Sequence, residues 1–296
     1  MTFRFKTAHA LFLPVILLGI GGCTQNSASS ADGYGNPLKN LAGSFLAARS
    51  FDKVMVALKS DDQQKLKAAS VDLQQAAKSK GNEYILPISI QSLANSGLYE
   101  DSRAMLAEAS EKPLLIKTAD KNYAAALSLL PTDYQKIAEL DLDSTTLNTL
   151  GYNLADRGKK PADFQLAEFL TAASLAKQDK AIKSLPADDP RMEELLLSRA
   201  VGAGDSKAWA LYKQGRYAQA RSEQEKVIEI AAQYSLSLKQ NLTPDLLFHL
   251  GEIYAALDEL SLAQSSYEAA LLLSPDDELK AKIELRLSAI ENARIS

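Results

Sequence analysis

Of the 296 residues, 46% are apolar, 33 are Lys or Arg and 37 are Asp or Glu, which gives a formal net charge of −4. This acidic balance argues against general binding to nucleic acids or anionic membranes, because both require basic patches. The sequence contains one cysteine, Cys23, so it cannot form an internal disulfide and packing alone must hold the fold together.

The first 22 residues have the layout of a secretory signal peptide. Arg4 and Lys6 form a short basic start, and an apolar stretch over 8–20 follows. This stretch of 13 residues, interrupted by Pro14, is too short to cross a membrane, which takes roughly 20 residues. We therefore expect residues 1–22 to be a cleaved export signal and not part of the fold.

The end of this segment, Ile20-Gly21-Gly22-Cys23, resembles the bacterial lipobox, although Leu is more usual where Ile20 stands. The resemblance implies that Cys23 is lipidated and becomes the new N-terminus. Several acyl chains on one cysteine hold a protein stably on a membrane. Because Thr24 replaces the Asp that often favours inner-membrane retention, the periplasmic face of the outer membrane is the expected location in a two-membrane host. An ordinary signal peptide with a chance cysteine is the alternative.

After the lipobox, the composition separates a linker from a helical body. Residues 23–37 are rich in Ser, Ala, Asn and Gly, which is typical of a flexible tether. From Leu38 onward Ala, Leu, Lys, Glu and Gln dominate, and all of these favour helices. The segment YILPISI (84–90) is the one plausible strand, but its flanks are helical and we interpret it as the start of a buried helix. The fold class expected is therefore all-α.

The clearest repeat lies near the end of the chain, in residues 246–277. Gly251 and Ala263 are small enough for two antiparallel helices to approach closely, and Pro275 ends the second helix. The segment resembles a tetratricopeptide repeat (TPR), with Leu247 in the place of the usual Trp and Tyr267 in that of the usual Phe. The matching positions are Leu247, Leu250, Gly251, Tyr254, Ala263, Tyr267, Ala270 and Pro275.

Earlier segments resemble the same repeat. In 205–230, Ala208 replaces the glycine, Gly215-Arg216-Tyr217 predicts the turn between two helices, and the second helix is expected to continue toward Leu238. A third copy begins at Ser144, where Leu147, Leu150, Gly151 and Leu154 are in register. The interval between these two copies leaves room for one extra helix near 190–201.

The resemblance to the repeat is weaker in 92–109 and weaker still in 40–60. In the first of these segments, Gly97-Leu98-Tyr99 is interpreted as another turn of the Gly-x-Tyr kind. The resemblance implies a right-handed superhelical solenoid of antiparallel helix pairs. We expect degenerate repeats over 38–143, TPR-like repeats over 144–277 and a capping helix over 278–296.

Few residues suggest a catalytic or metal-binding role. Outside the signal segment the only histidine is His249, which we expect to be structural or at the surface, because no set of metal ligands accompanies it and no Gly-x-Ser-x-Gly motif is present. In GDSK (204–207), Asp205 or Ser206 is expected to cap a helix, and DLDS (141–144) is expected to be the capped start of another. We therefore expect no catalysis, no cofactor and no bound metal.

In TPR proteins the first helix of each pair lines a groove that accepts peptides or partner helices. Exposed aromatic residues in such a groove anchor protein contacts. Ordinary packing is the alternative for Trp209 and Tyr212, and a solvated polar face is the alternative for Asn148 and Glu252. Carried across by spacing, the candidate groove residues are Asn148, Tyr152, Trp209, Tyr212, Lys213, Phe248 and Glu252.

The sequence thus predicts a membrane-anchored bacterial lipoprotein that acts as a non-catalytic scaffold or adaptor for envelope proteins or peptide segments. A carrier of a small envelope ligand is the first alternative, and a closed apolar pocket would favour it. An enzyme that uses only carboxylates, such as a glycosidase, is the second and would need two of them about 5 to 10 Å apart across a cleft.

Overall fold

The computed structural model describes residues 37–60, 62–78, 84–235 and 242–295. The expected signal peptide, the lipobox with Cys23, and nearly all of the linker lie outside the described residues. So does the expected continuation of a helix to Leu238, because the helix concerned is described as far as Ser235.

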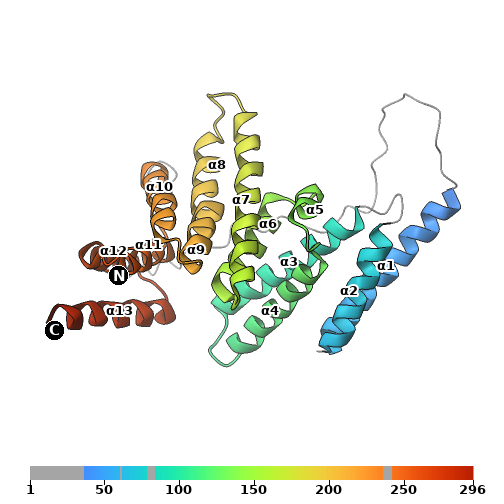
Figure 1. Cartoon of the computed structure of the whole chain (residues 1–296), viewed down its shortest axis with the longest axis horizontal. Helices are drawn as coiled ribbons and strands as arrows, with labels where there is room; N and C mark the ends of the chain where they lie inside the picture. Colours follow the sequence, from blue (N-terminus) through green and yellow to red (C-terminus); the bar gives the residue numbers. More distant parts are fainter. Residues whose placement is uncertain (1–36, 61, 79–83, 236–241, 296) are drawn as a thin grey trace, which may run out of the picture. The chain divides into compact units, whose positions relative to one another are not determined.

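All regular secondary structure in the described residues is helical, which confirms the all-α class (Figure 1). The segment at 84–90 is the start of a buried helix, as expected, with Leu86 and Ile90 inside the core. The helices are α1 (Pro37–Ser60), α2 (Gln63–Ala77), α3 (Ile85–Leu106), α4 (Lys112–Leu129), α5 (Tyr134–Glu139), α6 (Ser144–Arg157), α7 (Pro161–Lys183), α8 (Met192–Arg199), the π-helix η1 (Ala200–Gly204), α9 (Asp205–Lys213), α10 (Tyr217–Ser235), α11 (Pro244–Ala256), α12 (Leu260–Leu272) and α13 (Asp277–Ile295).

Aspartates begin several of these helices. The Asp143 carboxylate accepts a hydrogen bond of 2.6 Å from the backbone N–H of Thr146, which confirms the capped start expected for α6. Asp62 caps α2 in the same way, and Asp276 accepts from the N–H of Leu279 in α13. Each carboxylate satisfies backbone donors that have no partner within the first turn and faces the positive end of the helix dipole.

Consecutive helices pack as antiparallel pairs: α3 with α4, α6 with α7, α9 with α10, and α11 with α12 (Figure 1). Neighbouring pairs meet through α6 and α7 on α9 and through α10 on α11, and α9 makes a smaller contact with α11. The turn between α9 and α10 is the one expected, and Gly215 adopts φ +75° there, a conformation that glycine accepts without strain.

Glycine sets the separation of the helices in three of these pairs. A Cβ added to Gly97 in α3 or to Gly251 in α11 would lie 2.5 Å from the ring of Tyr123 in α4 or of Tyr267 in α12. A Cβ on Gly151 in α6 would lie 2.6 Å from the Thr171 side chain in α7. The residue opposite each glycine therefore packs directly on the backbone of the first helix.

One expected turn is wrong. Gly97-Leu98-Tyr99 lies inside α3, which continues to Leu106, and the connection to α4 follows at 107–111. Gly97 serves the contact with Tyr123 and not a reversal of the chain. A short Gly-x-Tyr string is compatible with both uses, and the long apolar helix on either side decides between them.

The extra helix expected near 190–201 is present as α8. The π-helix η1 joins it directly to α9, and Gly204 before α9 is itself helical. The expectation that Asp205 or Ser206 caps α9 is therefore wrong, because the backbone has no free helix terminus there. Asp205 is buried and its side chain is available for contacts with other helices.

The last helix, α13, packs on α12 and buries Ile283 and Ile290. Its other faces carry Lys, Glu and Arg side chains, as expected of a helix with one covered face. Within the described ranges, no helix combines the length and the apolar character that a membrane crossing requires.

Candidate functional site

The candidate groove residues lie on three first helices that pack in succession, α6, α9 and α11. Asn148 and Tyr152 are one turn apart on α6. Trp209, Tyr212 and Lys213 lie on α9, and Phe248 and Glu252 lie on α11. Spacing therefore places all seven residues on first helices, and the structure separates the accessible members of the set from the buried ones.

An aromatic stack joins α9 to α11. The Trp209 ring lies parallel to the Tyr212 ring with centroids 4.7 Å apart, and the His249 ring stacks 4.1 Å from the Trp209 centroid. The Lys213 ammonium lies 5.1 Å from the Trp209 ring centroid. Trp209 is only 6% exposed, so the expectation of an exposed aromatic anchor at this position is wrong and the packing alternative describes it.

His249 of this stack also contacts the buried carboxylate of Asp205. His249 Nδ1 is 2.9 Å from one carboxylate oxygen of Asp205 and 3.1 Å from the other. Gln224 of α10 donates a hydrogen bond of 2.8 Å to Asp205 and another of 3.0 Å to the carbonyl of Leu246. These contacts connect α9, α10 and α11, and they place His249 in the core and not at the surface.

The charge on His249 follows from its surroundings. Burial alone would lower the pKa of the imidazole, but Asp205, with smaller effects from Asp245 and Asp156, outweighs it and the pKa is raised. The raised pKa means that the protonated form of His249 persists to higher pH than it would in a free imidazole. A buried pair of this kind is tolerated because each charge has its partner and the carboxylate accepts a further hydrogen bond.

Glu252 is a second buried carboxylate, 6% exposed, and it connects four helices. It accepts hydrogen bonds from Arg286 of α13 at 2.6 and 2.9 Å, from Tyr267 of α12 at 2.6 Å and from Tyr212 of α9 at 3.3 Å. Both expectations for Glu252, a groove contact and a solvated polar face, are wrong. Burial and the nearby Glu252 charge raise the pKa of Tyr212 to about 12, so its hydroxyl stays a donor.

The members of the predicted groove that are not buried are Asn148, Tyr152, Tyr212, Lys213 and Phe248. Tyr152 is 37% exposed, and the other four are partly buried. Loss of hydration around the hydroxyl raises the pKa of Tyr152 well above its usual value, and the negative charges of Asp156, Asp205 and Asp245 raise it further. Tyr152 therefore presents a neutral hydroxyl and an aromatic ring next to acidic side chains.

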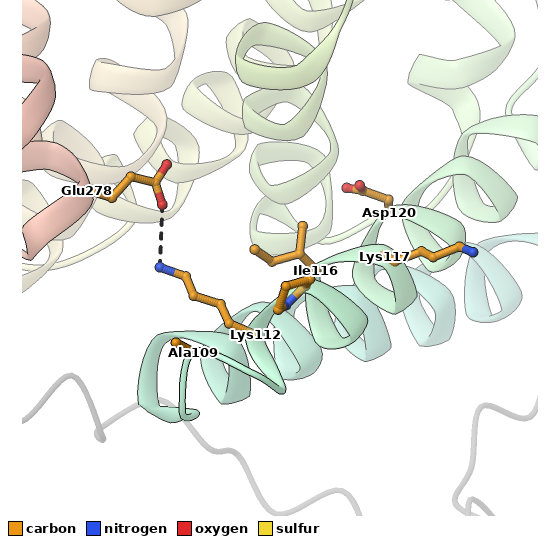
Figure 2. A pocket seen from close by; sticks show the side chains of 7 residues that line it. Ala109, Lys112, Ile116, Lys117, Asp120 and Glu278 are labelled. Carbon is orange, nitrogen blue, oxygen red and sulfur yellow. Dashed lines mark hydrogen bonds and ion pairs between the residues drawn. The ribbon is translucent and has the colours of Figure 1, made fainter.

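A recess of about 530 Å³ lies between α4 and the start of α13 and is open to solvent (Figure 2). The Lys112 ammonium reaches across it to Glu278 at 3.4 Å, and Ile116 and Asp120 line the α4 side. Its lining combines a small apolar floor with charged rims, which is the composition of a surface contact and not of an enclosed ligand site.

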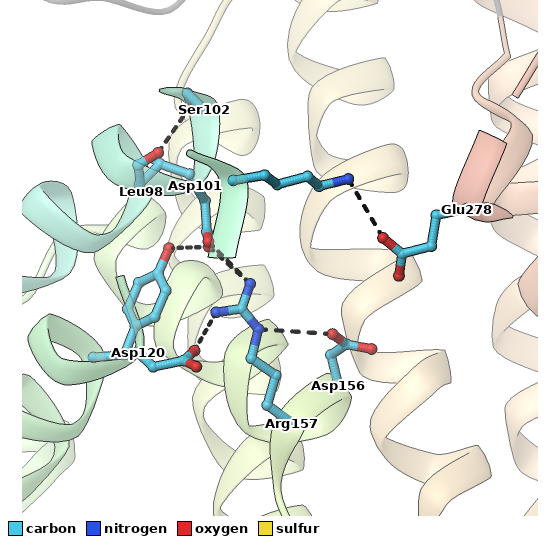
Figure 3. Close-up of polar contacts among 9 residues, drawn as sticks. Leu98, Asp101, Ser102, Asp120, Asp156, Arg157 and Glu278 are labelled. Atoms are coloured by element: carbon cyan, nitrogen blue, oxygen red, sulfur yellow. Dashed lines mark hydrogen bonds and ion pairs between the residues drawn. The ribbon is translucent and has the colours of Figure 1, made fainter. Parts of the chain in front are cut away.

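Next to the recess, Arg157 at the end of α6 connects three helices (Figure 3). It donates to both carboxylate oxygens of Asp101 in α3, at 3.0 and 3.1 Å, and to Asp120 in α4. The Tyr123 hydroxyl donates to Asp101 at 2.9 Å. Burial would lower the pKa of Arg157, but the two carboxylates raise it, so the guanidinium is a permanent charge.

Sequence reasoning did not identify the polar contacts of Asp205, Glu252 and Arg157, because each joins residues from helices far apart in the chain. In the described residues, no group of three or more His, Cys, Asp and Glu side chains is arranged to hold a metal ion. What the arrangement offers is a set of rigidly held helix faces with aromatic and charged side chains at their edges.

The fold and this site define an all-helical protein built from antiparallel helix pairs. Comparison with protein-family models, with curated proteins and with solved structures found no match for the chain.

Proposed function

We propose that this protein is a bacterial lipoprotein, anchored to a membrane of the cell envelope through Cys23, that acts as a non-catalytic scaffold or adaptor for envelope proteins. Its helix pairs would form a TPR-like right-handed solenoid. The resemblance of residues 20–23 to the lipobox supports the anchor, and the composition of residues 23–37 supports a tether that gives the body reach.

The observation that carries this proposal is the succession of α6, α9 and α11, which pack side by side with accessible groups on each. Tyr152, Lys213 and Phe248 supply an aromatic ring, a charge and a second aromatic ring along this row. Aromatic residues held in place by buried contacts are the usual anchors of protein recognition. The buried Trp209 and Glu252 keep the row rigid, so a partner would find it already formed.

The carrier alternative predicts an enclosed apolar pocket. The recess between α4 and α13 is instead open to solvent and has charged side chains on both sides. This recess therefore does not offer the shielded apolar site that a carrier of a small ligand needs.

The partner surface can be tested with a photocrosslinking amino acid in intact cells. A benzophenone side chain at position 152 would replace Tyr152, and the matched control would replace Tyr134 of α5, whose exposed fraction is 39% against 37% for Tyr152. We expect a defined protein adduct at position 152 and none at position 134. A lack of protein adducts at position 152 would overturn the scaffold proposal, and an adduct with a small molecule alone would favour the carrier.

The anchor needs a separate test. Cys23→Ser should move the protein from the membrane fraction to the soluble fraction and abolish labelling with radioactive palmitate. A Cys23→Ser protein that stays in the membrane fraction would contradict lipid anchoring at this residue.

A further inference from the structure

The solvent-facing side of α3 carries a row of large apolar side chains, which we term the α3 outer face. Its members are Ile88, Leu98, Tyr99, Met105 and Leu106, with exposed fractions of 55%, 40%, 53%, 68% and 89%. Single exposed apolar residues are ordinary, but four of these five are gathered in the last nine residues of α3 and Ile88 lies nearer its start; such accumulations mark interaction surfaces.

The α3 outer face is also nearly free of charge. The exposed residues between the apolar ones include Ser92, Ser96 and Ser102, and the hydroxyls of Ser96 and Ser102 donate to the carbonyls of Ser92 and Leu98 on the same helix. The one basic side chain, Arg103, lies 5.8 Å from the Tyr99 ring centroid and is paired with Glu100 at 2.9 Å. Removing this face from water would therefore leave few polar groups without a partner.

An uncharged surface gives no electrostatic preference for an acidic or a basic partner, and its best complement is another uncharged surface. The order of residues along α3 identifies one. Ile88 and Leu106 both lie nine residues from Gly97, and Ser92 and Ser102 both lie five residues from it. Counted in either direction from Gly97, the fifth residue is serine and the ninth is a large apolar residue, whereas Leu98, Tyr99 and Met105 lie on one side of it only.

Two-fold symmetric interfaces require this kind of pattern, because residue i of one subunit contacts residue j of the other and the reverse holds too. In an antiparallel α3 pair centred near Gly97, Ile88 packs against Leu106 of the partner subunit. Ser92 faces Ser102 of the partner subunit, and these small side chains let the two helices approach closely. Leu98, next to the centre, packs beside Leu98 of the partner subunit.

The size of the face fits a dimer contact. A helix of 22 residues is about 33 Å long. Five large apolar side chains at roughly 100 Å² each provide about 500 Å² of the ~800 Å² per partner that a standard interface buries. The serine and flanking side chains of the same face add to this area.

We infer that the protein forms a two-fold symmetric homodimer in which the α3 outer faces of two copies pack antiparallel. This dimer would present two candidate partner surfaces, one on each copy.

The test is the molar mass of the purified, detergent-solubilised chain, measured by size-exclusion chromatography with light scattering. Leu98→Glu places two carboxylates beside the symmetry axis, and the matched control is Leu262→Glu on α12, where the exposed fraction is 45% against 40%. We expect two chains per particle for the wild type and for Leu262→Glu. Leu98→Glu should be a monomer, with a dissociation constant raised at least 100-fold and an unchanged far-UV circular dichroism spectrum.

A charge-reversal pair tests the geometry. Leu98→Lys alone should be monomeric for the same reason, and an equimolar mixture of Leu98→Lys and Leu98→Glu should form a heterodimer, because the opposite charges then meet at the axis. The inference would be overturned by a wild-type protein that is monomeric at a concentration of about 100 μM. It would also be overturned by a Leu98→Glu variant that is folded and dimeric.

Discussion

The close contact between α11 and α12 is open to a direct test by Gly251→Ala. The added Cβ would lie 2.5 and 2.6 Å from two ring carbons of Tyr267, well inside the range at which one group must move. The ring cannot move easily, because it is fully buried and its hydroxyl donates a 2.6 Å hydrogen bond to Glu252.

The net effect combines two opposing contributions. Overpacking of a close-packed contact lowers the free energy of unfolding by about 1–3 kcal/mol. The upper end of this range is expected here, because the Tyr267 ring is buried and its hydroxyl is hydrogen-bonded to Glu252. Alanine is favoured over glycine inside a helix by about 1 kcal/mol. We therefore expect Gly251→Ala to lower the free energy of unfolding by about 2 kcal/mol, which corresponds to a decrease in Tm of roughly 4–8 °C.

Urea unfolding followed by circular dichroism at 222 nm measures this difference. Gly202→Ala is the matched control, because its added Cβ would meet only Asn148 Nδ2 at 3.7 Å, an ordinary contact. It should leave the protein as stable as the wild type or slightly more stable. In a Tyr267→Leu background the ring is absent, so Gly251→Ala should lose most of its cost. Equal stability of Gly251→Ala and the wild type would refute the contact.

Three further predictions concern the buried charges. Because the pKa of His249 is raised, its contact with Asp205 stabilises the fold fully below about pH 6.5 and loses this effect as the pH rises through the raised pKa. Each pKa unit by which the folded state exceeds the unfolded state contributes about 1.4 kcal/mol. The difference in free energy of unfolding between the wild type and His249→Gln should therefore narrow from pH 6 to pH 9 in urea unfolding. Glu252→Gln removes the charge that Arg286 faces, and because that arginine is 51% exposed we expect a loss of about 1 kcal/mol, seen as several-fold faster hydrogen exchange in α13. Arg157→Ala should lower the free energy of unfolding by about 1 kcal/mol in thermal or urea unfolding, because Arg157 joins three helices.

Each of these predictions has a control or a contradicting result. A stability gap that widens with pH would mean that His249 is buried in its neutral form. Unchanged exchange in α13 after Glu252→Gln would show that apolar packing alone holds that helix. For Arg157→Ala the control is Arg191→Ala, which removes an ion pair between an exposed arginine and Asp189, two residues away in sequence, and should leave the stability unchanged.

The helices of the C-terminal half could be predicted from sequence because their signals are local. Leu250, Gly251 and Tyr267 lie at the spacings of the repeat that the sequence resembles, and these residues form the contact between α11 and α12. The cap at Asp143 and the turn at Gly215 could be predicted for the same reason, because each is determined by a few adjacent residues.

The errors arise where distant residues decide the outcome. The string at Gly97 is compatible with a turn, but it lies within α3, where Gly97 packs against Tyr123, 26 residues further along. Asp205 has the chemistry of a helix cap, but η1 extends the preceding helix through it and the carboxylate binds His249 instead. Glu252 was expected at an accessible surface, and Arg286 on a helix beyond the repeat encloses it. A single sequence contains no local signal for such contacts.

The stack of His249 on Trp209 has a spectroscopic consequence. Trp209 is the only tryptophan of the chain, so it is the dominant source of indole emission. An imidazolium 4.1 Å from the centre of an excited indole accepts electron density from it and quenches its fluorescence, whereas a neutral imidazole does so weakly. The emission intensity of the unmodified protein therefore reports the protonation of one buried side chain, and with it the integrity of the contact between two helix pairs, without any added label.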